Sequence, residues 1–360
     1  MPIIQERTKH PATASKCGLG ENVARSRDIL ETGIYKSDPE ILHLLLCDRS
    51  TGRNLRWATK DYIKRGVKGF SEWDHITIKN ITGKNGSVIQ PRVDKSSAEQ
   101  RARVEQRAEV FTPSWVCNKQ NNLVDAAWFE RDNAGFNEEV DGSTHGWKTL
   151  AQRIAFPKQL KKTWWDYIKA PRLEVSCGEA PYLTSRYDTV TGDFIPTADR
   201  IGFLDRKLRI VSENAKDKAK WLEGALWSLK SVYGYEYQGD NVLLARENVL
   251  FAVKEYYEDI FKEPVPSDFL RSCAVVISWN IWQMDGIKFV VPGTCHNARL
   301  VQMNFLDPPS EERGCPGCRD NDPLKHNGIR CHIKAWESET EVYFKPPFDF
   351  EPIAKEAPHE

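Results

Sequence analysis

Residues 173–183, Leu-Glu-Val-Ser-Cys-Gly-Glu-Ala-Pro-Tyr-Leu, join a short apolar run to a carboxylate and a Ser-Cys-Gly turn. The run predicts a strand, and the turn predicts the start of a helix. A strand that ends in a tight glycine turn before a helix presents free backbone N–H groups to a ligand, and nucleotide-like cofactors bind there. Because such units are common, the segments on either side must decide what the loop around Gly178 binds.

The segments after this loop alternate between helical and extended patterns. Apolar residues recur at helical spacing after residue 214. A second apolar stripe follows Asp240 and ends before Pro264. A short apolar run that ends at Glu236 predicts a strand, and Ser267 is expected to cap another helix. This alternation predicts a parallel α/β sheet. Strands are expected before the loop, over 232–235 and over 287–291, and helices over 214–232, from 240 and from 267.

The segments before the loop are expected to contain a hairpin and two helices. Residues 72–81 and 88–93 resemble strands around a glycine-containing turn at 83–86. A helix is expected over 96–109, and another from Ser114, where Pro113 begins the helix and Thr112 or Ser114 caps it. Loops are expected over 131–146 and 184–199.

The composition is that of an ordinary soluble chain. Its 360 residues suggest one large or two modest domains, with 40% apolar and 28% charged residues. Lys plus Arg equals Asp plus Glu, at 51 each, so net charge does not attract the whole chain to nucleic acid. A local basic face would still be enough, and the 96–109 helix carries either a solvated face or a phosphate-contacting one. No membrane span or secretory signal is apparent, so a cytoplasmic protein with nine scattered thiols is expected.

The order of four short motifs resembles the DNA adenine-N6 methyltransferases of restriction–modification systems, their modification subunits in particular. Residues 109–113, Glu-Val-Phe-Thr-Pro, resemble the Phe-Thr-Pro motif, and residues 174–182 resemble the cofactor loop, with Ala180 at its second glycine. Tyr235-Glu236 resembles the second motif, and residues 280–286 resemble the third motif through Asp285. The resemblance covers roughly residues 97–292.

The resemblance implies a Rossmann-like methyltransferase sheet that binds S-adenosylmethionine and acts on double-stranded DNA. The target base would leave the helical stack, and a restriction or specificity subunit would be a partner. Glu236 would accept hydrogen bonds from the ribose, and Asp285 would contact the adenine ring. Each residue also has a plainer reading, with Glu236 on the surface, Asp285 in a turn and Phe111 in the core. The cofactor-binding residues implied are Phe111, Thr112, Pro113, Glu174, Ser176, Cys177, Gly178, Ala180, Glu236 and Asp285.

The catalytic tetrapeptide of this family, Asn/Asp/Ser-Pro-Pro-aromatic, has no intact copy in the chain. Residues 307–310, Asp-Pro-Pro-Ser, lack the aromatic ring, and residues 345–348, Lys-Pro-Pro-Phe, have a cation in place of the acceptor. Asp307, Pro308 and Pro309 are therefore the candidate catalytic residues, with an ordinary turn as the alternative. Two functions stay open: a methyltransferase, and a non-catalytic or split subunit that binds cofactor, DNA or a partner chain.

A group of cysteines and histidines near the C-terminal end has metal-ligand spacing. Cys315 and Cys318 form a Cys-x-x-Cys pair, and His326, Cys331 and His332 follow within fifteen residues. Adjacent residues seldom both bind one ion, so His326 and Cys331 are the expected further ligands. Four such ligands predict a structural zinc site, with free thiols as the alternative. The expected organisation is therefore an α/β chain with three parts. These are a mixed N-terminal region (1–95), a methyltransferase-like domain (96–300) and a small Cys/His-containing segment (301–360).

Overall fold

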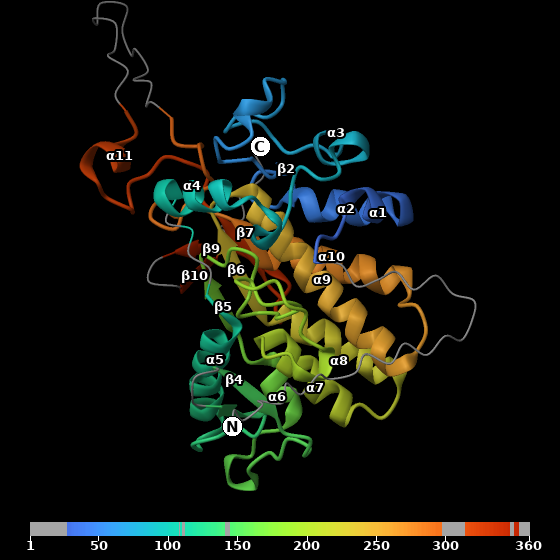
Figure 1. Cartoon of the computed structure of the whole chain (residues 1–360). Coiled ribbons are helices and arrows are strands. Elements are labelled where there is room, and N and C mark those ends of the chain that lie inside the picture. Colours follow the sequence, from blue (N-terminus) through green and yellow to red (C-terminus); the bar gives the residue numbers. More distant parts are fainter. Residues whose placement is uncertain are drawn as a thin grey trace, which may run out of the picture.

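A three-stranded parallel sheet lies at the centre of the computed structural model (Figure 1). The structure describes residues 27–107, 109, 112–140, 145–296, 314–345 and 349–352. The strands are β5 (Arg172–Val175), β6 (Val232–Glu236) and β7 (Ile281–Gln283), in the order β5-β6-β7. The expectation of an α/β fold with a parallel sheet is confirmed, whereas a methyltransferase sheet remains a prediction.

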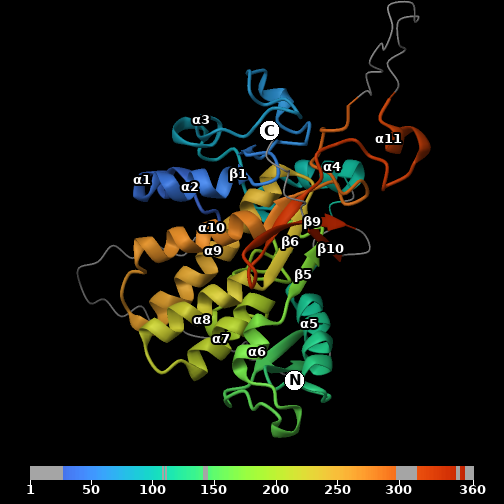
Figure 2. The same ribbon diagram turned by 180° about the vertical axis from the view of Figure 1, so that it is seen from behind.

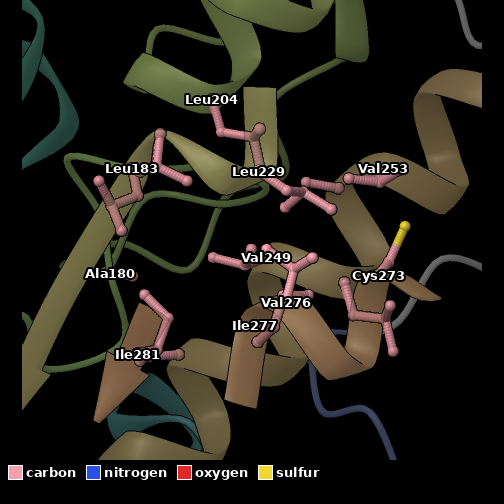
Figure 3. Packing of buried hydrophobic residues seen from close by; sticks show 14 of the residues in the cluster. Ala180, Leu183, Leu204, Leu229, Val249, Val253, Cys273, Val276, Ile277 and Ile281 are labelled. Atoms are coloured by element: carbon pink, nitrogen blue, oxygen red, sulfur yellow. The ribbon is translucent and has the colours of Figure 1, made fainter. Parts of the chain in front are cut away.

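One face of the sheet packs against four helices. These are α7 (Phe203–Asn214), α8 (Lys218–Lys230), α9 (Gly239–Phe261) and α10 (Ser267–Asn280), which pack against one another and lie together in both views (Figures 1 and 2). Figure 3 shows Leu229, Val249 and Ile277 from these helices meeting Ile281 of β7 in the core. The helices form because apolar side chains recur at the expected spacing, and the α9 helix ends at Phe261, shortly before Pro264.

The opposite face of the sheet is covered by an antiparallel meander. Its strands are β8 (His332–Ala335), β9 (Thr340–Lys345) and β10 (Asp349–Pro352). Tyr235 and Trp282 pack with Phe344 of this meander in a second apolar cluster, whereas Ile281 belongs to the first. Successive strand residues point to opposite faces, so β6 and β7 are buried on both sides, whereas Val175 on the edge strand β5 is exposed.

The N-terminal region packs on the carboxyl end of the sheet and on α9. Arg56 exchanges backbone hydrogen bonds with the Gln283 side chain, and a Cβ on Gly239 would lie 1.9 Å from the Arg56 carbonyl oxygen. Glycine is therefore required where α9 begins. The regular elements of this region are α1 (Glu31–Ser37), α2 (Pro39–Leu46), β1 (Cys47–Asp48), β2 (Arg53–Asn54), α3 (Ile78–Ile81) and α4 (Ser97–Arg107).

The hairpin expected over 72–93 is wrong. Residues 78–81 form the short helix α3, because the Asn80 side chain accepts hydrogen bonds from Thr77 at the helix start. Gly83–Asn85 and Arg92–Asp94 form 3₁₀ turns in place of a turn and a second strand. The helix expected over 96–109 is confirmed as α4.

The segment between α4 and β5 contains two helices and a hairpin. α5 (Ser114–Phe129) is confirmed, but Thr112 and Ser114 do not cap it, and the Ser114 N–H instead donates to Asp188. The loop expected over 131–146 includes β3 (Asn137–Val140), which pairs with β4 (Gly146–Thr149). α6 (Trp164–Lys169) leads into β5, and α11 (Pro316–Asp320) is the short helix near the C-terminal end.

The third strand lies earlier in the chain than expected. β7 covers residues 281–283, whereas Ile287 is 77% exposed in a turn closed by hydrogen bonds from Lys288 and Phe289 to the Asp285 carbonyl. The apolar run at 287–291 is therefore only partly buried. No helix within the described residues is long and apolar enough to cross a membrane.

Candidate cofactor loop and metal centre

The loop after β5 has an unusual backbone. Ser176, Gly178 and Ala180 have φ angles of +50°, +52° and +64°, the left-handed region that favours glycine. The conformation is held because the Cys177 N–H donates to the Tyr235 carbonyl at 2.8 Å, and the Ala180 N–H to the Cys177 carbonyl at 2.7 Å. Ala180 therefore keeps a glycine-like conformation at the position where the resembling family has its second glycine. Non-glycine residues in this conformation cluster at functional sites.

Two buried glutamates hold this loop through its backbone N–H groups. Glu236, at the end of β6, accepts from Gly178 at 3.0 Å and from the N–H groups of residues 237 and 238. Glu174, in β5, accepts from Tyr182 and Leu183 at 3.2 and 3.1 Å. Burial raises the pKa of both carboxyl groups, that of Glu174 to about 8, although these N–H donors act in the opposite direction. The reading of Glu236 as a surface carboxylate is wrong.

The helix expected directly after the loop is absent from residues 179–202. This stretch has turns and a 3₁₀ turn at Thr197–Asp199 before α7 begins at Phe203. The loop N–H groups of Gly178, Tyr182 and Leu183 donate to carboxylates. A helix N-terminus that binds an anion, as a dinucleotide phosphate would require, is therefore not formed here.

Among the residues that the structure describes, two buried acceptor oxygens beside Glu236 have no hydrogen-bond partner. The Gln238 amide donates to Glu109 Oε2 at 3.1 Å, and this leaves Gln238 Oε1 and Glu109 Oε1 unpaired. Arg103 forms an ion pair with Glu109 at 3.1 Å and also contacts Asp240. Unpaired buried acceptors are costly, and they mark a place where a donor group of a ligand could bind.

The other described residues implied by the resemblance make structural contacts of their own. Asp285 follows β7, and its side chain accepts from the Ile287 and Lys288 N–H groups, as in an ordinary turn. Pro113 precedes α5, and the Thr112 carbonyl accepts from Thr189. Cys177 is buried, and its Sγ would lie 3.1 Å from a Cβ on Gly234 of β6. Phe111, Asp307, Pro308 and Pro309 lie outside the described residues.

Three cysteines and a histidine converge near α11. The Nδ1 atom of His326 lies 3.6 Å from Cys295 Sγ, 3.5 Å from Cys315 Sγ and 3.6 Å from Cys318 Sγ. The four ligand atoms all lie within 4.8 Å of one another, so they can hold a metal ion. Bond lengths of about 2.3 Å to sulfur and 2.0 Å to nitrogen give a tetrahedral S···N edge of about 3.5 Å. The observed separations match this edge.

The prediction of Cys331 as the fourth metal ligand is corrected to Cys295. Cys331 is fully buried in the second apolar cluster, and its thiol donates to the Gln283 carbonyl at 3.5 Å. Cys295 lies 20 positions before the Cys-x-x-Cys pair, so the spacing of ligands after that pair does not reveal it. A Cys-His pair at 295–296 was the available signal.

The backbone around the cluster is fitted to these ligands. The Asn327 N–H donates to Cys315 Sγ at 3.4 Å, a contact that stabilises a thiolate. A Cβ on Gly317 would lie 2.6 Å from the backbone nitrogen of His326, so only glycine lets the turn approach the histidine this closely.

Comparisons with protein-family models, with curated proteins and with solved structures gave no match.

Proposed function

We propose that the chain binds S-adenosylmethionine and methylates adenine N6 in double-stranded DNA, as the modification subunit of a restriction–modification system. The observation that most supports the proposal is the hydrogen bond of 3.0 Å from the Gly178 N–H to Glu236 Oε2. It joins the ends of two neighbouring parallel strands, and ligands of α/β sheets bind at this carboxyl edge.

The buried carboxyl groups around the loop favour this cofactor over a dinucleotide. Glu174, Glu179 and Glu236 are all buried around the loop, and a diphosphate would meet carboxyl groups there. S-adenosylmethionine has no phosphate and a cationic sulfonium, and when bound it supplies a transferable methyl group. The unpaired Gln238 Oε1 and Glu109 Oε1 would accept hydrogen bonds from hydroxyl or amino groups of the adenosyl moiety.

Transfer of the methyl group needs an acceptor for the adenine amine and a ring that stacks on the flipped base. Asp307, with Pro308 and Pro309, would supply the acceptor, but Ser310 stands where an aromatic residue is expected. This difference supports the second function, a non-catalytic or split subunit that binds the cofactor and needs another chain for transfer.

The cluster of Cys295, Cys315, Cys318 and His326 would hold Zn²⁺. Three thiolates and one imidazole suit this ion, and four protein ligands leave no position for a reactive water. Its proposed role is therefore structural. The ion would tie the segment after β7 to α11.

The test combines cofactor binding with methyl transfer by the whole chain. Isothermal titration with S-adenosylmethionine should detect binding, and tritiated cofactor should label unmethylated duplex DNA. The Glu236→Gln variant should bind the cofactor at least ~10-fold more weakly, because its amide cannot accept all three backbone donors. Glu223→Gln, an exposed change on α8, should bind normally.

The outcomes separate the two functions. Absence of binding to the wild-type chain would refute the proposed cofactor. Binding without label on DNA would favour the subunit over the enzyme.

A further inference from the structure

A basic loop projects from the N-terminal region next to the candidate cofactor loop. Lys64, Arg65 and Lys68 are exposed, and no carboxylate of the described residues lies within ion-pair distance of them. The loop's acid, Asp61, is already paired with Arg103 at 3.0 Å. Residues 60–68, here called the basic loop, therefore present an uncompensated positive charge to solvent.

Two aliphatic side chains are exposed on the same loop. Ile63 is 48% exposed and begins a 3₁₀ turn that ends at Arg65, and Val67 is 63% exposed directly after Gly66, whose φ is +64°. Val67 follows Ile63 by four positions, so cationic and aliphatic side chains are exposed together on this short segment. The loop thus combines cationic and apolar contacts within a few residues.

The base of the loop is attached to the candidate site. The buried Tyr62 hydroxyl donates to Asp240 Oδ2 at 2.7 Å, and the Tyr62 ring packs 4.4 Å from that of Trp57. Asp240 lies four residues after Glu236, and Arg103 connects it to Asp61. The blue N-terminal region and α4 lie at the same end of the molecule in Figure 1. The loop is therefore firmly placed beside the carboxyl edge of the sheet.

We propose that the basic loop is a contact surface for double-stranded DNA, an inference that rests on the proposed function. Lys64, Arg65 and Lys68 would contact phosphates, which position a protein on the duplex without reading sequence. Ile63 and Val67 would contact the base step that an extruded adenine leaves open, as aliphatic wedges do. An anionic membrane would also attract such a loop. A single 3₁₀ turn beside the cofactor edge, in place of an amphipathic helix, favours DNA.

The test measures binding of the whole chain to a fluorescein-labelled 30-base-pair duplex at several salt concentrations. The triple change Lys64→Glu, Arg65→Glu and Lys68→Glu should weaken binding at least ~10-fold and reduce the salt slope by about 2 to 3. The matched control has Lys36→Glu, Lys79→Glu and Lys84→Glu, three exposed lysines outside the loop. Its affinity should stay within about threefold of wild type. A further pair, Ile63→Ser and Val67→Ser, should lower methyl transfer more than it lowers binding.

Cofactor titration of every variant separates this inference from the proposed function. Unchanged S-adenosylmethionine affinity together with lost DNA binding confirms the assignment. Equal losses in the loop variant and its control, or no loss in either, would overturn it. A wild-type chain that binds the cofactor and vesicles of phosphatidylcholine and phosphatidylserine, but not DNA, would overturn the loop assignment and leave the cofactor site standing. A chain that binds DNA through the loop but no cofactor would refute only the proposed cofactor.

Discussion

The Sγ atom of Cys295 lies 3.6 Å from Nδ1 of His326, although 31 positions separate the two residues in the chain. Cys295 belongs to the segment that leaves β7, and that segment contacts the N-terminal region. The Arg56 side chain donates to the Gly293 carbonyl at 3.2 Å, and a Cβ on Gly293 would collide with the Trp73 ring. A metal at this cluster would therefore fix the point where three parts of the chain meet.

The identity of the fourth metal ligand gives the first prediction. Cys295→Ala should reduce bound zinc from about one ion per chain to a small fraction, because three remaining ligands leave the tetrahedron open. Cys331→Ala should keep about one ion per chain, since its thiol bonds to the Gln283 carbonyl. Elemental analysis of the purified proteins measures both. Full zinc occupancy in Cys295→Ala, with loss of zinc in Cys331→Ala, would instead support the fourth ligand predicted from the sequence, Cys331.

How far the sequence could predict this fold is clear from neighbouring elements. β6 and α8 to α10 were predictable because their apolar residues repeat at the period of the element. α7 has a similar repeat at Leu204, Leu208 and Val211, but the full burial of Arg206 and Lys207 within it could not be predicted. Their charged groups are satisfied by Asp125 and by carbonyl oxygens of Ile168 and Ala170, which lie far away in the sequence. Such long-range partners leave no periodic signal.

The candidate sites show the same limit. The residues of the cofactor loop are contiguous, so the sequence could locate Gly178 and the strand-end carboxylate Glu236. It could not show that their hydrogen bond occupies the N–H group expected to face a ligand. The choice between Cys295 and Cys331 likewise depended on the path of the chain after β7.

The left-handed conformation of Ala180 gives the second prediction. Ala180→Gly loses a buried methyl group but relieves about 1 kcal/mol of backbone strain, so stability should stay within about 1 kcal/mol of wild type. Ala225→Gly, at an equally buried position inside α8, should cost about 2 kcal/mol, because helix propensity and burial are both lost. Urea denaturation of the two variants provides the comparison. Equal destabilisation of the two variants would contradict the claim that the backbone at Ala180 is strained.

The third prediction concerns two buried carboxyl groups between α1 and α9. Glu31 and Glu247 are each 1% exposed, and neither oxygen of Glu247 has a hydrogen-bond partner within the described part of the chain. Burial raises the pKa of Glu31 to about 8 and that of Glu247 well above its usual range. The negative charge of Asp28 also raises the pKa of both groups, whereas the positive charge of Arg186 lowers the pKa of Glu247. The folded chain therefore keeps protons that the unfolded chain releases above its ordinary glutamate pKa.

Stability should consequently fall as the pH rises from about 5 to about 8, because the unfolded state binds fewer protons in this window. Glu247→Gln removes one of these groups and should raise the melting temperature at pH 8 by ~2 °C or more, with little change at pH 5. Glu263→Gln, an exposed change after α9, is the control and should follow the wild-type pH profile. Thermal melts between pH 5 and pH 8.5 measure the difference. If the Glu247→Gln curve runs parallel to that of the wild type, the Glu247 side chain is already ionised and paired in the folded protein. Glu31 and Glu247 would then not retain protons in the folded chain.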